Sequence, residues 1–245
     1  MKQIYFLLAF SFLRPLSAGL PPDSLKRIQG VFGKESACFV LKEKAASKNQ
    51  ITFGKKLCES SFELGDRALL PLAITATERG LIQDEKTLFK WDGTRYPNKL
   101  WNKDQFVTDW LQNQVSWVTD RLRLQIGADP IEKHLKEFQL DGLVSTNRLL
   151  SFSEKFFLRT LPIKKETQEV ARRFFYIGKY REGSEVWGQK ASGADYASFV
   201  GHLVLKNQTW TFTTLLKPSK ESSEPVTAER AQALSMDALT ELGLF

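Results

Sequence analysis

The chain is poor in the residue types that hold metal ions and redox centres, with two cysteines, two histidines and two methionines among its 245 residues. The histidines, His134 and His202, lie far apart in the sequence, and neither has a second ligand at a spacing that metal sites use. We therefore expect neither a metal site nor a cofactor. Both histidines are interpreted as surface or packing residues.

A membrane-spanning helix needs an apolar run of ~20 residues, and the chain has no such run after residue 18. A shorter run, residues 4–13, lies between the basic Lys2 and a small-residue site that ends at Ala18. This order is typical of a secretory signal peptide, whereas a buried N-terminal helix would show a polar face. We expect residues 1–18 to be removed and residues 19–245 to be secreted, into the periplasm if the cell is Gram-negative.

No compact basic run accompanies the net charge of +7, because the lysines and arginines are spread along the chain. A scattered distribution is typical of a solvated basic surface and not of a nucleic-acid site. We expect no nucleic-acid partner, while attraction to anionic wall polymers or lipid head groups stays open. The composition, with 42% hydrophobic and 26% charged residues, is that of a globular protein and excludes a disordered chain.

The two cysteines, Cys38 and Cys58, lie at the start of one predicted strand and the end of the next. Export would place them in an oxidising compartment, where disulfides form and persist. A disulfide and a pair of small buried thiols are both compatible with the sequence.

Strands are predicted near both ends of the chain and helices between them. β-Branched and aromatic residues dominate the predicted strands, and apolar residues three and four apart mark most of the predicted helices. The strands are 38–42, 50–54, 185–189, 197–205 and 209–216. The helices are 22–29, 103–111, 115–126, 131–138, 149–161, 166–175 and 227–242.

This order predicts one α+β domain over residues 19–245. Residues 37–54 and 185–216 would form a single antiparallel sheet, with the terminal helices on one face and the mainly helical part, residues 66–183, on the other.

The stretch from residue 67 to residue 78 is nearly all apolar, too long for one strand and too short for a bilayer. It predicts a buried central helix. Asp66 before it is a good N-cap, and Gly80 after it suits the left-handed position that ends many helices.

Residues 74–85, ITATERGLIQDE, and residues 89–93, FKWDG, carry a resemblance to a known family. They resemble the active-site helix, and the block after it, of the class D (oxacillinase-type) serine β-lactamases and the related penicillin-binding transpeptidase-like domains. The resemblance implies the β-lactamase/transpeptidase-like fold, in which an antiparallel sheet is flanked by terminal helices and joined to a helical subdomain.

Four further residues of this region are similar to the family: Trp91 and Asp92 in the FKWDG block, and Trp101 and Asp104 after it. A buried indole N–H seeks an acceptor. We therefore expect these four residues to be structural and to fasten the loop that follows the central helix.

The catalytic pair of the family is missing. Counting back from the FKWDG block, the nucleophilic serine falls on Asp66 and the catalytic lysine on Leu69, and the chain contains no Ser-x-x-Lys elsewhere. Acyl transfer requires a nucleophile beside a base, and Asp66 with Leu69 offers neither a hydroxyl nor an amine. Asp66 is interpreted as a helix cap, with a carboxylate nucleophile or base as the alternative, and Leu69 would make the cleft more apolar.

Two other family motifs are partly kept. Ser116-Trp117-Val118 lies where the family has Ser-x-Val, and without a lysine partner Ser116 is interpreted as a helix residue that bonds to backbone. The Lys-Thr-Gly position falls on Gln189 or on Lys190, and only one of them can face the cleft because neighbouring strand residues point to opposite faces. The expected cleft is therefore lined by Ser116, Trp117, Val118 and either Gln189 or Lys190.

These observations predict a secreted class D β-lactamase-like pseudoenzyme, without catalytic activity, that binds or scaffolds in the cell envelope. Its partner would be a peptidoglycan fragment, a β-lactam or an envelope protein. One alternative is a weak β-lactam-hydrolysing or penicillin-acylated enzyme that uses Ser60, Ser61 or Ser116. Another is a non-covalent sensor of β-lactams or peptidoglycan fragments.

Overall fold

The computed structural model of the chain describes residues 20–44, 49–64, 69–180, 183–206 and 208–245. Two predicted features lie outside these residues: the signal peptide, 1–18, and the cap at Asp66. Within the described ranges, no helix is long and apolar enough to cross a membrane.

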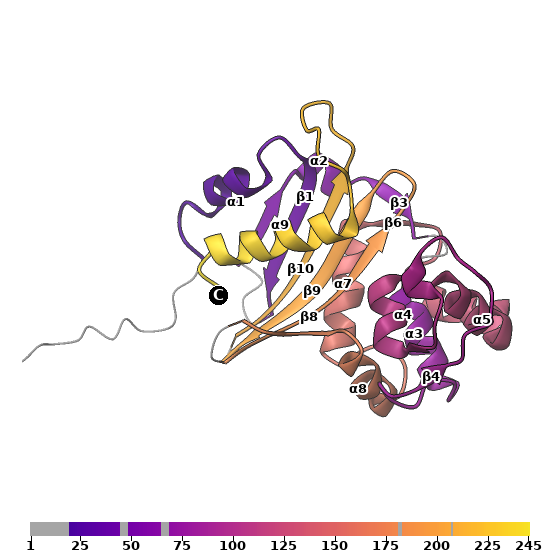
Figure 1. The fold of residues 1–245 in the computed structure, drawn as a ribbon. Helices are drawn as coiled ribbons and strands as arrows, with labels where there is room; N and C mark the ends of the chain where they lie inside the picture. The colour runs from indigo at the N-terminus through magenta and orange to yellow at the C-terminus, as the bar shows by residue number, and fades with distance from the viewer. Residues whose placement is uncertain (1–19, 45–48, 65–68, 181–182, 207) are drawn as a thin grey trace, which may run out of the picture.

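One antiparallel sheet dominates the structure, with its six strands in the spatial order β2-β1-β10-β9-β8-β7 (Figure 1). The central pairing of β1 with β10 joins the two ends of the chain, with Cys38 opposite Leu215. The strands are β1 (Ser36–Glu43), β2 (Gln50–Phe53), β7 (Tyr176–Lys179), β8 (Ser184–Ser192), β9 (Ala197–Leu205) and β10 (Gln208–Lys217).

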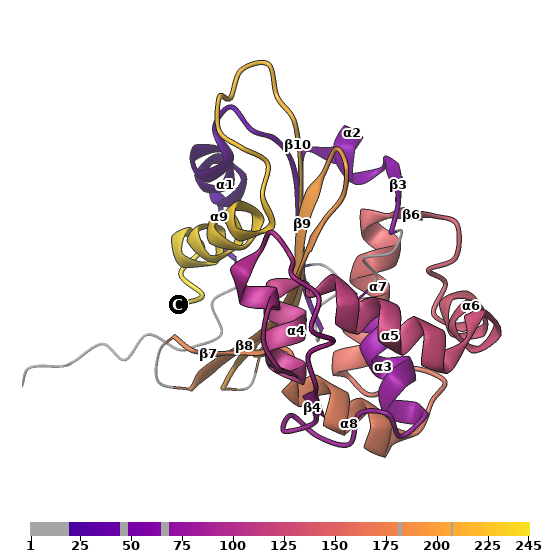
Figure 2. The same ribbon diagram turned by 45° about the vertical axis from the view of Figure 1, so that its right-hand side comes forward.

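The two faces of the sheet carry separate hydrophobic cores because side chains alternate along each strand. On β10, Trp210 and Phe212 belong to one core and Leu215 to the other. The first face packs against α1 (Ser24–Phe32) and α9 (Ala228–Glu241), and the second against α7 (Thr146–Phe157). Figure 2 shows the terminal helices on one side of the sheet and the remaining long helices on the other.

The helical part is built around α3 (Leu69–Glu78), which contacts three of its neighbours, α5, α6 and α8. Residues 69–76 are all buried, as expected for a helix that is apolar on every side. Gly80, with φ +74°, ends the segment as predicted. The neighbouring helices are α4 (Val107–Asn113), α5 (Ser116–Ile126), α6 (Ala128–Glu137) and α8 (Lys165–Arg173).

Short elements connect these layers. Two small antiparallel pairs lie outside the main sheet, β3 with β6 and β4 with β5. The bounds of the short elements are α2 (Lys55–Cys58), β3 (Ser61–Glu63), β4 (Leu88–Phe89), the 3₁₀ helix η2 (Lys99–Trp101), β5 (Gln105–Phe106) and β6 (Leu143–Ser145).

The predicted α+β class and sheet arrangement are confirmed. Most element boundaries shift by a few residues, and strands form at β5 and β7 where helical structure was predicted. β7 falls in the segment predicted to be helical, because this short, half-exposed edge strand has no apolar alternation that marks it in the sequence. The helix predicted from residue 103 begins at Val107, because β5 pairs with β4 before it, opposing Phe106 to Leu88.

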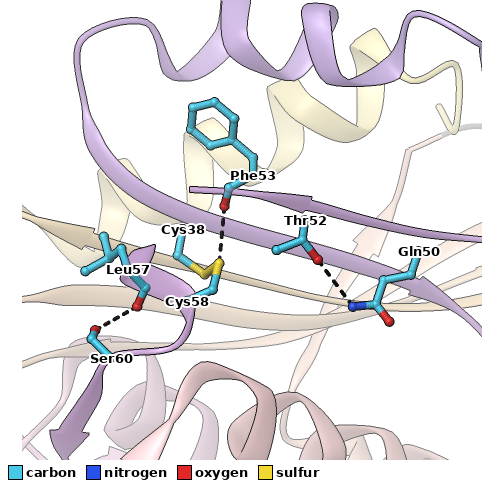
Figure 3. The surroundings of a disulfide bond; sticks show 7 residues. All are labelled: Cys38, Gln50, Thr52, Phe53, Leu57, Cys58 and Ser60. Carbon is cyan, nitrogen blue, oxygen red and sulfur yellow. Dashed lines mark hydrogen bonds between the residues drawn. A yellow bond between two sulfur atoms is a disulfide. The ribbon is translucent and has the colours of Figure 1, made fainter. Parts of the chain in front are cut away.

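Cys38 and Cys58 form a disulfide, the first of the two alternatives that the sequence left open (Figure 3). Cys58 lies in α2 and not at a strand end, because the chain turns at Gly54 directly after β2. A side chain at Gly54, where φ is +67°, would collide with the carbonyl oxygen of Ala37. The turn and the disulfide together hold α2 against β1.

Candidate functional site

A cleft of about 610 Å³ lies where α3, η2, α4, α5, β8 and the start of α9 come together. Its volume is within the usual range of small-molecule sites. Its lining is mostly polar. Among the described residues, it is lined by Leu69, Asn98, Leu100, Trp101, Gln112, Asn113, Gln114, Ser116, Thr119, Asp120, Lys190, Ser192 and Glu229.

Three of the positions that the sequence singled out meet in this cleft. Leu69 begins the described part of α3, Ser116 is the first residue of α5, and Lys190 lies on β8. They are far apart in the sequence, and the packing of the helical part against the edge of the sheet brings them to one cavity.

The structure chooses between the two registers that the sequence allowed on β8. Lys190 lines the cleft, whereas the side chain of Gln189 is buried and its Nε2 donates to the backbone oxygen of Lys190 at 2.6 Å. Gln189 instead borders a smaller adjoining recess of about 220 Å³, which it shares with Gln112 and Asn113. Lys190 is therefore the cation of the cleft.

The charge of Lys190 is paired with a carboxylate from a distant part of the chain. Its Nζ lies 3.1 Å from Oε1 of Glu229, in the first turn of α9. Burial opposes ionisation of Glu229, but hydrogen bonds from its own backbone N–H and from Lys190 outweigh that effect and lower its pKa. The ammonium therefore has a fixed anionic partner before any ligand arrives.

The other described side chains of the cleft do not form a hydrogen-bonded pair of nucleophile and base. Leu69 is 4% exposed and belongs to the hydrophobic core, so its side chain offers no acid or base. The Ser116 hydroxyl forms no hydrogen bond to another described residue, which differs from the predicted bond to backbone. Asp120 follows Ser116 by one helical turn, yet no hydrogen bond joins the two described side chains.

Trp117 and Val118, which the sequence placed in the cleft, lie in the core of the helical part. Residues three and four apart share a helix face, so α5 turns Ser116, Thr119 and Asp120 toward the cleft and its other side chains away. Trp117 donates from Nε1 to the backbone oxygen of Trp101 at 2.9 Å. Its effect on the cleft is therefore indirect.

The loop after α3 is held by the carboxylates that the sequence marked. Asp104 accepts hydrogen bonds from the backbone N–H of Trp91 at 2.9 Å and from Nζ of Lys90 at 2.8 Å. The bond from Lys90 is the largest of the effects that lower the pKa of Asp104. Asp92 accepts a hydrogen bond from the Tyr96 hydroxyl at 2.8 Å.

Trp101 connects this loop to the cleft. Its Nε1 donates to the backbone oxygen of Asn113 at 3.0 Å, and its own carbonyl oxygen accepts the bond from Trp117. The ring also packs edge-on against Tyr96, with centroids 5.8 Å apart. Trp101 is therefore a rigid wall of the cleft.

His134 joins two helices away from the cleft. Its Nδ1 lies 2.9 Å from the Thr75 hydroxyl on α3, and its Nε2 lies 2.8 Å from a carboxylate oxygen of Glu78. The order hydroxyl, imidazole, carboxylate resembles a catalytic triad, but the Thr75 side chain is buried between α3 and α6 and cannot contact a substrate. The cluster therefore fastens α6 to α3.

Several cleft residues were not singled out from the sequence. The run Gln112-Asn113-Gln114, at the end of α4, is the one local signal that could have marked them. Asn98, Asp120, Ser192 and Glu229 reach the cleft only through tertiary packing.

Residues 42–150 match the family model of the penicillin-binding protein transpeptidase domain. The chain is 23% identical to β-lactamase OXA-1 of Escherichia coli over 199 residues, which cover 72% of each protein. It is 24% identical to the regulatory protein BlaR1 of Staphylococcus aureus over 238 residues, which cover 87% of this chain and 39% of that protein.

Solved structures of class D β-lactamases share the fold. The class D β-lactamase BAT-2 superposes with a TM-score of 0.78 at 17% identity, covering 89% of this chain and 96% of the other. A class D β-lactamase from Bacillus subtilis gives the same values. The structure is thus a class D β-lactamase fold. In sequence and fold the chain is similar to class D β-lactamases and to the penicillin-binding transpeptidase domain, which confirms the resemblance seen in the sequence.

Proposed function

We propose that this chain is an exported, non-catalytic member of its family that binds a ligand in the cleft without forming a covalent bond to it. The observation that carries the proposal is Leu69. Acylation and deacylation by the family require a base beside the nucleophile, and an aliphatic side chain stands at the lysine position.

The surroundings of Leu69 support the same reading. The titratable side chains among the described cleft residues are Asp120, Lys190 and Glu229. Lys190 is paired with Glu229, and neither it nor Asp120 is hydrogen-bonded to the Ser116 hydroxyl. The cleft has a volume of about 610 Å³, and its described residues lack a coupled nucleophile and base. Such a cleft is suited to binding a ligand without reacting with it.

The match to the regulatory protein BlaR1, which covers 87% of this chain, supports a regulatory role in which the ligand is bound and not turned over. In this proposal the ligand is a peptidoglycan fragment or a β-lactam that is bound without turnover. A scaffold that contacts an envelope protein through its outer surface is the second candidate.

The first test is the intact mass of the mature chain after incubation with a panel of penicillins, with β-lactamase OXA-1 as the positive control. The expected result is no mass shift under conditions that label the control. A stoichiometric adduct would overturn the proposal, and peptide mapping to Ser60, Ser61 or Ser116 would identify the enzyme alternative.

A thermal-shift series separates ligand binding from scaffolding. A melting temperature that rises and saturates with a peptidoglycan fragment supports a binding site, since a ligand of the native state stabilises it by mass action. No shift across the panel would favour the scaffold. The proposed export is tested by sequencing the N-terminus of the protein from the cell envelope fraction, where we expect Gly19 as the first residue.

A further inference from the structure

Side-chain amides are the commonest polar group of the cleft. Gln112, Asn113 and Gln114 line it without a side-chain hydrogen bond to any other described residue. Asn98 accepts a bond from the backbone N–H of Leu100 at 3.0 Å, which leaves its NH₂ group for a ligand. A carboxamide both donates and accepts, as hydroxyl and acetamide groups do. The cleft therefore offers several matched partners for such groups.

The charges of the cleft disfavour an anionic ligand. Its described charged residues are Asp120, Lys190 and Glu229, and the Lys190 ammonium is bound to the Glu229 carboxylate. A ligand carboxylate at Lys190 would lie beside the Glu229 carboxylate and would also face Asp120. Unpaired like charges brought together on binding are costly.

An apolar surface lies beside these polar groups. The side chain of Trp101 is fixed by its bond to Asn113, and Leu100 next to it is 53% exposed. Binding sites for small molecules combine such apolar contacts with a few placed polar groups. The CH face of a sugar ring is a ligand surface that fits this combination.

We propose that the cleft binds an uncharged oligosaccharide that carries hydroxyl and acetamide groups, and that it discriminates against carboxylate ligands. In this assignment the amides of Gln112, Asn113 and Gln114 hold the polar groups, and Trp101 with Leu100 contacts the apolar face of a sugar ring. The inference rests on the proposed non-covalent binding function and names the class of ligand for that cleft.

The test is calorimetric titration of the mature chain with three probes: tri-N-acetylchitotriose, benzylpenicillin and N-acetyl-D-alanyl-D-alanine. The first is neutral and carries acetamide groups, while the other two each carry a free carboxylate. The expected result is saturable binding of the oligosaccharide, accompanied by a change in tryptophan fluorescence, and no saturation with either carboxylate at the same concentration.

Two variants locate the site. Asn113→Ala and Gln112→Ala each remove one amide, while the Asn113 backbone oxygen that holds Trp101 stays in place. Each is expected to weaken oligosaccharide binding about three- to tenfold, the range for one net hydrogen bond. Gln29→Ala, which removes an exposed amide on α1, is the matched control and should bind like the unmodified chain.

The outcomes separate this inference from the proposed function. Binding of a carboxylate probe but not of the oligosaccharide, or of no probe at all, overturns the inference and leaves non-covalent binding of another ligand open. Oligosaccharide binding that neither cleft variant weakens also overturns it. A covalent adduct with benzylpenicillin overturns the proposed function itself.

Discussion

Lys190 on β8 and Glu229 at the start of α9 form an ion pair, with Nζ and Oε1 3.1 Å apart, at the edge of the cleft. The Lys190 side chain is 20% exposed and that of Glu229 is 70% exposed, so water screens the pair and its contribution to stability is small. The pair bears on the proposed ligand choice, because Lys190 is the one cation among the described residues of the cleft.

Releasing Lys190 should therefore shift the ligand preference. Glu229→Gln removes the negative charge and keeps the length of the side chain. We expect the variant to bind benzylpenicillin about two- to fivefold more tightly than the unmodified chain, in line with the energy of an exposed pair. Titration at low salt, with benzylpenicillin at higher concentrations than in the three-probe comparison, measures the change. Glu221→Gln, on the exposed segment before α9, is the control, and equal affinities for all three proteins would contradict the prediction.

A second prediction concerns His202, which is 2% exposed on β9 and stacks on Phe157 with ring centroids 4.6 Å apart. Burial, with smaller contributions from the positive charges of Arg172 and Lys44, lowers the pKa of His202 from 6.5 to about 3. Between pH 6.5 and about pH 3, His202 is therefore protonated in the unfolded chain and neutral in the folded chain. The free energy of unfolding is unaffected by this residue above pH 6.5 and falls as the pH drops from 6.5 toward 3.

For His202, we expect the free energy of unfolding to fall by about 2 kcal/mol between about pH 8 and pH 5 from this residue alone. His202→Gln keeps a neutral partner for the Thr211 hydroxyl, which lies 3.1 Å from Nδ1. The variant should lose that part of the pH dependence in denaturant titrations. Parallel curves for both proteins over this range would show that His202 is not the cause.

The disulfide gives a third prediction. Cys38 and Cys58 are 20 residues apart, and closing a loop of that length stabilises a protein by about 3 kcal/mol through the unfolded chain. Replacing both cysteines by alanine should lower the free energy of unfolding by about this amount in oxidising buffer. A reducing agent should lower the stability of the unmodified chain and leave the variant unchanged. The same response to reductant in both proteins would contradict the bond.

Restoring the family lysine should be costly in this cleft. Leu69 is 4% exposed within the hydrophobic core, and a charged group placed there loses most of its hydration. We expect Leu69→Lys to lower the free energy of unfolding by about 2–4 kcal/mol, the upper part of the range for single substitutions. Leu100→Lys, at an exposed position of the same cleft, is the control and should change stability by less than about 0.5 kcal/mol.

Chemical denaturation of both leucine variants measures this difference. If Leu69→Lys is as stable as the unmodified chain, the start of α3 has room and water for an ammonium, and the burial argument is wrong.

Asp66→Ser combined with Leu69→Lys then tests the scaffold, because it returns the nucleophile and the base to the sequence positions where the family has them.

Much of the fold was predictable because the strongest signals are local. The apolar run that ends at Gly80 requires a buried helix whatever surrounds it, and α3 is that helix. The long strands β9 and β10 alternate or remain apolar over most of their length. β7 carries no such signal, since an edge strand of four residues owes its structure to pairing with β8.

The cleft was predictable only in part. Leu69, Ser116 and Lys190 were found by their spacing within motifs, yet the choice of Lys190 over Gln189 came from the tertiary structure. Trp117 is adjacent to Ser116 in sequence but turns into the core, because one residue along a helix is a rotation of about 100°.

The sequence by itself determined the order of the long strands and helices, the central apolar helix and the chemical identity of Leu69. Each of these depends on residues within one segment. Only the tertiary structure decided that β8 pairs with β9 so that Lys190 lies opposite Phe199, and that Glu229 reaches the Lys190 ammonium. Strand register and the position of α9 depend on packing between segments that are distant in the chain. No local sequence pattern specifies which of these segments come together.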